Sequence, residues 1–193
     1  MMRLPWLTVT LVLSALVVYC FSSLSQGLIF DRTLVLEGQW WRVPTSLLVH
    51  YSASHLFWNM APFFVLGTIL EQENRRAFIW LLILVSISNG LFLFNPNIDL
   101  FAGASGLVIA IAGYCCIVKM VKGESRFLWG LLFAVLVAKI GYEMMSGEEL
   151  FASGNFHVLP EAHLLGLVSA IVLFLIQAGT VPFGVSKVMM SKR

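Results

Sequence analysis

Residues 100–114 read LFAGASGLVIAIAGY, an almost wholly apolar stretch that carries one aliphatic hydroxyl group, on Ser105, among small residues. The whole chain is 59% hydrophobic and 11% charged, with a mean hydropathy of +0.89, whereas soluble domains are roughly 25% charged. This composition excludes a soluble domain and indicates a membrane protein. Its 193 residues suffice for one bundle of helices, so we expect a single transmembrane domain over residues 1–193.

Apolar segments long enough to cross a bilayer recur along the chain, since a spanning helix needs roughly 20 mainly apolar residues. We therefore predict an all-α, polytopic bundle of six transmembrane helices. Five segments are clear and a sixth, which contains Lys139, is weaker. In chain order they are Leu4–Phe30, Val43–Leu70, Ala77–Ile98, Leu100–Val118, the weaker Phe127–Tyr142, and Leu164–Ser186.

The basic residues are unevenly divided between the two sides of this predicted bundle. Arg32 and Arg42 fall on one side, and the other side holds Arg3, Arg75, Arg76, Lys119, Lys122, Arg126, Lys187, Lys192 and Arg193. The positive-inside rule then predicts that both termini are cytoplasmic. Residues 1–20 also resemble a cleaved signal peptide, but their apolar run exceeds the usual h-region and no A-x-A-like site follows.

The fourth predicted helix is short and its serine is submerged. Residues 95–104 contain Pro96 and several helix-poor residues, so we expect the helix to begin near Ser105. From there to Lys119 the rise is about 21 Å at ~1.5 Å per residue, which is less than a hydrocarbon core of ~30 Å. Ser105 should therefore lie below the outer surface, where irregular backbone is tolerated only inside protein or beside a water-filled cavity.

Histidines are predicted on the same side of the membrane as this serine. All four of them, His50, His55, His157 and His163, fall toward the outer side of the bundle. A serine becomes a nucleophile when a base within hydrogen-bond reach takes its proton. The resulting oxyanion needs hydrogen-bond donors. His55 and Asn59, four residues apart on one helix face, are candidates for that role.

Four motifs together resemble the rhomboid intramembrane serine proteases in their minimal six-helix, bacterial form. They are GASG at 103–106, AHLLG at 162–166, HYSASHLFWN at 50–59 and WWR at 40–42. The resemblance covers nearly the whole chain. It implies Ser105 as the nucleophile, His163 as the general base, and His55 with Asn59 as oxyanion donors.

The same resemblance implies structural roles close to the predicted site. His50 would be structural, Gly103 belongs to the serine motif, and Gly106 and Gly166 would allow close packing of the fourth and sixth helices. It further implies an active site toward the outer side of a bacterial inner membrane and no cofactor or metal. Substrates would be single-pass transmembrane proteins, cut near the outer face of the bilayer.

One residue departs from the pattern common in bacterial members. A tyrosine often follows the serine by four residues, and here that position is Ile109. A specialised subgroup, such as rhombosortase-like enzymes that process C-terminal membrane anchors, therefore stays open. So does a catalytically silent protein that binds membrane clients. A small transporter is favoured little, because the six spans are unequal and show no visible inverted repeat.

Several remaining groups have simpler interpretations. Trp40 and Trp41 suit the membrane interface, with Arg42 reaching phosphate headgroups. Lys139 and Glu143, spaced i and i+4, are predicted to form a structural ion pair. His157 is assigned to a loop over residues 144–162. The resemblance implies that this loop acts as a gate and cap for substrate entry.

The scattered charge gives no support to nucleic-acid binding, and the oligomeric state is not predicted.

Overall fold

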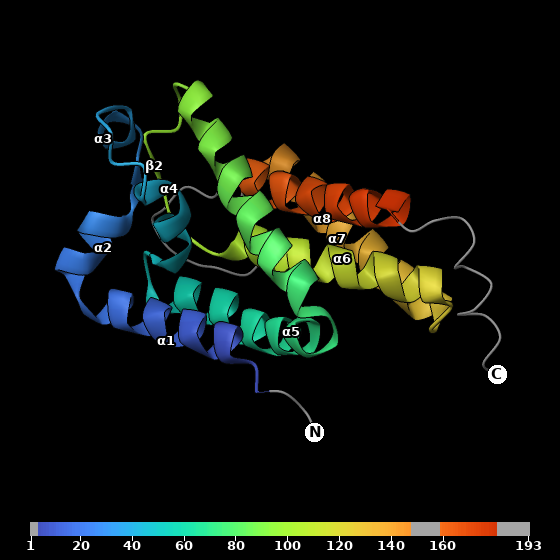
Figure 1. The fold of residues 1–193 in the computed structure, drawn as a ribbon. Coiled ribbons are helices and arrows are strands. Elements are labelled where there is room, and N and C mark those ends of the chain that lie inside the picture. Colours follow the sequence, from blue (N-terminus) through green and yellow to red (C-terminus); the bar gives the residue numbers. More distant parts are fainter. Residues whose placement is uncertain (1–3, 148–158, 181–193) are drawn as a thin grey trace.

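The computed structural model describes residues 4–147 and 159–180, and its elements are almost all helices (Figure 1). The predicted all-α, polytopic class is therefore confirmed. The helices are α1 Trp6–Cys20, α2 Ser22–Leu28, α3 Arg32–Leu36, α4 Arg42–Thr45, α5 Ala53–Asn89, α6 Ser105–Lys122, α7 Arg126–Ser146 and α8 Pro160–Thr180, with 3-10 turns η1 Ser46–Leu48 and η2 Gly90–Phe94. Strands β1 Phe30–Asp31 and β2 Leu100–Phe101 form a short antiparallel pair.

Among the described residues, four helical stretches are long and apolar enough to cross a membrane, or five when α1 and α2 are counted as one bent span. The longest, Ala53–Phe94, has 42 residues, about twice the length that one crossing needs. Its backbone leaves the helical region at Asn74 (φ −151°, ψ 77°). The chain turns there (Figure 1), so the second and third predicted spans are the two halves of α5.

Two predicted boundaries are wrong. The expected span Leu4–Phe30 is bent by 114° between α1 and α2. The expected span Val43–Leu70 begins as a helix only at Ala53, because residues 42–48 form the short turns α4 and η1. Ser52 provides the start signal, since its Oγ accepts a hydrogen bond of 3.0 Å from the N–H of His55.

The predicted start of the fourth helix is confirmed, whereas the last helix begins four residues before its predicted span. Helix α6 begins at Ser105 and ends before Gly123, whose φ of +81° is the left-handed conformation that favours glycine at a helix end. Helix α8 begins at Pro160, where a missing N–H costs nothing because it would have no helical acceptor. With 18 residues, α6 continues to Lys122, three residues past the predicted end at Lys119, so its rise is about 27 Å at ~1.5 Å per residue and the helix is longer than expected.

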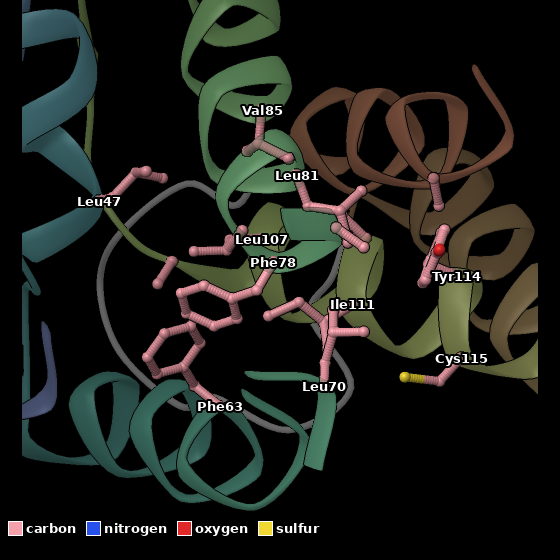
Figure 2. Close-up of a cluster of buried hydrophobic side chains, with 14 of the residues drawn as sticks. Leu47, Phe63, Leu70, Phe78, Leu81, Val85, Leu107, Ile111, Tyr114 and Cys115 are labelled. Carbon is pink, nitrogen blue, oxygen red and sulfur yellow. The ribbon is translucent and has the colours of Figure 1, made fainter. Parts of the chain in front are cut away.

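The core lies between α5 and α6, with α8 against the other face of α6 (Figure 2). Phe63, Phe78, Leu81 and Ile111 are at most 1% exposed. Since lipid tails are as apolar as these side chains, close packing rather than exclusion of water must hold the helices together. Small residues achieve this between α6 and α8, where Ala110 and Ala170 are both 0% exposed.

Helix α1 is held at its N-terminus by a residue from α5. Glu71 is 5% exposed, and its carboxylate accepts hydrogen bonds from the N–H of Leu7 (3.1 Å), the N–H of Thr8 (2.8 Å) and the hydroxyl of Thr8 (2.9 Å). Pro5, at the N-cap of α1, makes no side-chain capping bond. The first turn of α1 is therefore completed by a distant carboxylate instead of a local cap.

Helix α7 lies at the edge of the bundle. Its buried residues are Ile140 and Glu143, and large apolar side chains along it, such as Phe127, Leu131 and Val135, are more than half exposed. A soluble protein would not leave such a surface in water. This face of α7 is suited to contact with lipid.

Candidate active site

Ser105 is held at the first residue of α6 by a well-bonded preceding segment. Strand β2 pairs with β1, with Phe101 opposite Phe30, and the N–H of Gly103 donates to the carbonyl of Ser46 (3.0 Å). Gly103 has a φ of +124°, and a Cβ there would lie 2.8 Å from His55 Nε2. This position therefore requires glycine, because the backbone is in the left-handed region and because no room is left for a side chain. Irregular backbone is accommodated here by burial in protein.

Helices α6 and α8 touch through their backbones beside Ser105. A Cβ added to Gly106 would lie 2.7 Å from the carbonyl oxygen of Ala162, and one added to Gly166 would overlap the backbone of Gly106. Ser105 and His163 are the chain neighbours of Gly106 and Ala162. Ser105 and His163 therefore each lie next to a backbone contact between the two helices.

Ser105 and His163 line one cavity of about 720 Å³, together with Asn59, Ile109 and Lys139. Ser105 is half-buried and His163 is 1% exposed. The rest of the wall consists mainly of apolar side chains from the first half of α5. The cavity thus joins polar groups from α5, α6, α7 and α8 in apolar surroundings, which is typical of a binding site.

The two remaining described histidines lie behind this cavity. His55 is 4% exposed, and its Nδ1 accepts from the N–H of Tyr51 (3.4 Å), so its proton is on Nε2, the atom next to Gly103. His50 packs edge-on against the His55 ring, with centroids 5.0 Å apart, and its Nδ1 lies 3.3 Å from the carbonyl of Leu48. Burial and the neighbouring His55 lower the pKa of His50 to about 3.

Asn59 is 2% exposed and belongs to the same helix face as His55. Its Nδ2 donates to the carbonyl of His55 (2.8 Å). An amide nitrogen has two hydrogens, so this bond leaves one for a group in the cavity. The structure therefore brings together Ser105, His163 and Asn59 at the cavity and puts His55 under the Gly103 loop.

Lys139 and Glu143 form the expected ion pair, with Nζ and Oε1 2.5 Å apart. A further contact was not predicted: Glu143 Oε2 lies 2.7 Å from His163 Nδ1. Glu143 is 0% exposed. The sequence contains a signal for this residue, because an acid at membrane depth is a candidate functional group by default, but nothing local links residue 143 to residue 163.

Arg42 was expected to reach toward phosphate headgroups, and this prediction is wrong. Its side chain is 6% exposed, and it donates to the carbonyls of Gln26 (2.8 Å) and Ile29 (2.9 Å) and to Gln39 Oε1 (2.7 Å). The three acceptors belong to α2, to the residue that follows it and to the turn before α4, so the guanidinium is bonded within the protein. Trp40, by contrast, is 59% exposed, as an interfacial side chain would be.

Parts of the predicted site lie outside the described residues. They are His157 and most of the loop over 144–162 that was expected to act as gate and cap. Within residues 4–147 and 159–180, no group of three or more His, Cys, Asp or Glu side chains could hold a metal ion.

Comparison with known proteins identifies the family to which the chain is similar. The profile of the Rhomboid domain matches residues 37–179. The chain is 27% identical to the putative rhomboid protease YdcA of Bacillus subtilis (strain 168), over 88% of this chain and 86% of that protein. It is 27% identical to rhomboid protease GlpG of Haemophilus influenzae, over 85% and 88%. It is 25% identical to rhomboid protease GluP of Bacillus subtilis (strain 168), over 80% of this chain but 34% of that protein, so it spans about a third of GluP.

Proposed function

The chain belongs to the rhomboid family of intramembrane serine proteases, and we propose that it cleaves transmembrane proteins with Ser105 as nucleophile and His163 as general base. The observation that carries this proposal is the backbone contact between Gly106 and Ala162 beside a shared cavity. His163 takes the proton of the Ser105 hydroxyl as Oγ bonds to the scissile carbonyl carbon. It then returns that proton to the leaving amide nitrogen.

His55 and Asn59 are proposed to stabilise the oxyanion. Asn59 has a donor hydrogen on Nδ2 at the cavity that Ser105 lines, and the donor hydrogen of His55 is on Nε2, beside Gly103, two residues before Ser105. In apolar surroundings such fixed donors lower the barrier much more than they would in water. His50 would support the His55 ring without touching substrate.

Alanine substitution tests the dyad. Ser105→Ala and His163→Ala should each abolish cleavage of a transmembrane substrate in proteoliposomes. Thermal unfolding should be nearly unchanged in Ser105→Ala, whereas His163→Ala should lower the unfolding temperature because the buried Glu143 loses a partner. His157→Ala should reduce cleavage only mildly. Labelling by a fluorophosphonate should occur in the natural protein and disappear in Ser105→Ala. If His157→Ala abolishes cleavage and His163→Ala does not, the assignment of the base is wrong.

The oxyanion donors require a quantitative assay. Loss of one preorganised donor typically lowers turnover about 10²–10³-fold, less than loss of the nucleophile. His55→Ala and Asn59→Ala should each lower kcat by that order, with KM changed little because the ground-state substrate does not use these donors. Unaltered turnover in both variants would exclude them from the mechanism.

Substrate entry is proposed to be lateral, between the first half of α5 and α7. A second apolar cavity of about 590 Å³ lies along α7 and shares Leu66 and Lys139 with the first cavity. A helix arriving from the lipid along this path must unwind before attack, because its carbonyls are hydrogen-bonded internally. We therefore expect single-pass substrates with small residues at the cut and Gly or Pro nearby.

A reversible tether tests this path. In a background without Cys20, Cys115 and Cys116, the free cysteines of the described residues, a disulfide would join the outer end of α7 to the outer end of the first half of α5, near Ala53. Cleavage of a transmembrane substrate should slow when the disulfide forms and recover with reductant. A tethered enzyme that cuts at the full rate would refute entry by this path while leaving the chemistry intact.

The active site is proposed to face the outer side of the membrane, with both termini cytoplasmic. Ser105 and Lys119 lie at opposite ends of α6, and Lys119 bonds Glu73 (2.9 Å), near the break in α5 that is followed by Arg75 and Arg76. The basic residues thus gather at the end away from the serine, and positive-inside bias puts that end in the cytoplasm. Reporter fusions after residue 122 and after residue 98 should score as cytoplasmic and external, and the reverse pattern would overturn the orientation.

A further inference from the structure

Glu143 joins the proposed catalytic histidine to a third helix. Its Oε2 lies 2.7 Å from His163 Nδ1, and its Oε1 lies 2.5 Å from Lys139 Nζ. Glu143 is 0% exposed and His163 is 1% exposed. The carboxylate is therefore bound on both oxygens, by a lysine on its own helix and by a histidine 20 residues further along the chain.

These contacts determine which nitrogen of His163 bears the proton. A carboxylate bonded to a lysine is an acceptor only, so Nδ1 of a neutral His163 must be the N–H that donates to it. The proton of the imidazole is then on Nδ1, and Nε2 is left as an acceptor. Partners of the remote ring nitrogen fix the tautomer and orientation of a histidine in this way.

We propose that Glu143 is a positioning residue for catalysis, which holds His163 in the tautomer that can accept the Ser105 proton and stabilises the imidazolium that follows. This inference rests on the proposed function of Ser105 and His163. During attack the proton moves from Ser105 Oγ to His163 Nε2, and later from Nε2 to the leaving nitrogen. Glu143 stays ionised throughout, and its charge offsets the positive charge that appears on the ring.

A purely structural role accounts less well for the arrangement. Burying a carboxylate costs several kcal/mol of free energy, and the attraction of a partner charge offsets this cost only when the geometry is good. A protein with apolar residues of similar size in place of the ion pair is often as stable or more stable. Glu143 and Ile140 are the buried residues of α7, and Ile140 packs with Ile109 and Leu167. An apolar side chain at 143 could extend that cluster, whereas only an acceptor can orient His163.

Glu143→Gln is the decisive variant because it preserves shape and removes charge. Lys139 needs an acceptor, so the amide oxygen should turn to Lys139 and leave the NH₂ group facing His163. Nδ1 would then have to accept, which moves the ring proton to Nε2, the wrong tautomer for a base. Loss of the corresponding tautomer control in a serine protease lowers kcat about 10⁴-fold; we expect a fall of about 10²–10⁴ in kcat with little change in KM.

Glu71→Gln is the matched control. Glu71 is also a buried glutamate, 5% exposed, but it caps α1. It should lower the thermal unfolding temperature and leave kcat and the His163 tautomer unchanged. Glu143→Asp keeps the charge on a shorter side chain and should recover part of the turnover that Glu143→Gln loses.

The tautomer is measured directly by ¹⁵N NMR of histidine-labelled protein, which separates a positioning role from a structural one. The natural protein should show His163 protonated on Nδ1, and Glu143→Gln should show it on Nε2. An Nε2–H tautomer in the natural protein overturns the proposal, even if Glu143→Gln fails to fold. So does a folded Glu143→Gln enzyme with natural turnover. Full cleavage by Ser105→Ala would instead overturn the proposed function, a result independent of the His163 spectrum.

Discussion

Gly106→Ala tests whether the close contact between α6 and α8 sets the catalytic geometry. The added Cβ would lie 2.7 Å from the carbonyl oxygen of Ala162, which is 0.7 Å short of the 3.4 Å where ordinary contact begins (3.4 − 2.7). The neighbour is backbone and cannot rotate away, so the two helices must separate by about that amount at the level of Ser105 and His163. Displacements of ~1 Å at an active site cost about 10²-fold in rate, and we expect a 10- to 100-fold loss of kcat.

The stability of this variant should change much less than its activity. Overpacking costs about 1–3 kcal/mol, whereas replacing Gly by Ala inside a helix gains about 1 kcal/mol, so the net loss should be at most about 2 kcal/mol. Gly179→Ala, on α8 with no atom within 4 Å of its added Cβ, is the control and should keep its natural activity. Turnover would be measured on a transmembrane substrate in proteoliposomes, and unfolding in detergent. Natural turnover by Gly106→Ala would refute the reasoning.

Three further changes test separate parts of the site. Gly103→Ala combines a φ of +124° with a Cβ 2.8 Å from His55 Nε2, so it should lose about 1–3 kcal/mol of unfolding free energy together with most turnover; an unchanged melting temperature would contradict this. Arg42→Lys cannot reach all three acceptors and should lower the free energy of unfolding by about 2–4 kcal/mol, and an unchanged thermal unfolding temperature would contradict this. Because burial lowers the pKa of His50 to about 3 from 6.5, the unfolded chain takes up a proton below about pH 6.5 that the folded chain refuses. Stability should therefore be full above that pH and fall by up to about 1.4 kcal/mol per unit as pH drops toward 3; His50→Gln should show a shallower slope in acid unfolding, and equal slopes would argue against a neutral buried His50.

The start of α6 could be predicted because its signals are local. Pro96 and Gly103 disfavour helix in the segment before Ser105, and the apolar residues that follow Ser105 favour it. The bend after Cys20 had no such signal, since residues 4–26 contain no glycine and their one proline is at position 5. Composition alone therefore suggested one straight span.

The features that could not be predicted from the sequence depend on contacts between segments that are distant in the chain. An arginine beside two tryptophans looks the same in the sequence whether it faces headgroups or, like Arg42, bonds to carbonyls at the end of helix α2. Lys139 and Glu143 were paired by their spacing on one helix, but the bond from Glu143 to His163 depends on how α7 and α8 pack. The pairing of β1 with β2 likewise joins residues about 70 positions apart.

The cap that Glu71 supplies to α1 has a consequence for the order of biosynthesis. The first turn of α1 is completed by a carboxylate 63 residues later in the chain, so a ribosome has made α1 long before its cap exists. Helix α1 and the first half of α5 should therefore join as a pair only after Glu71 has left the ribosome. Nascent chains arrested with Glu71 still inside the ribosome and with Glu71 fully outside it should differ in the protease resistance of α1, and equal resistance would show that the pair forms without its cap.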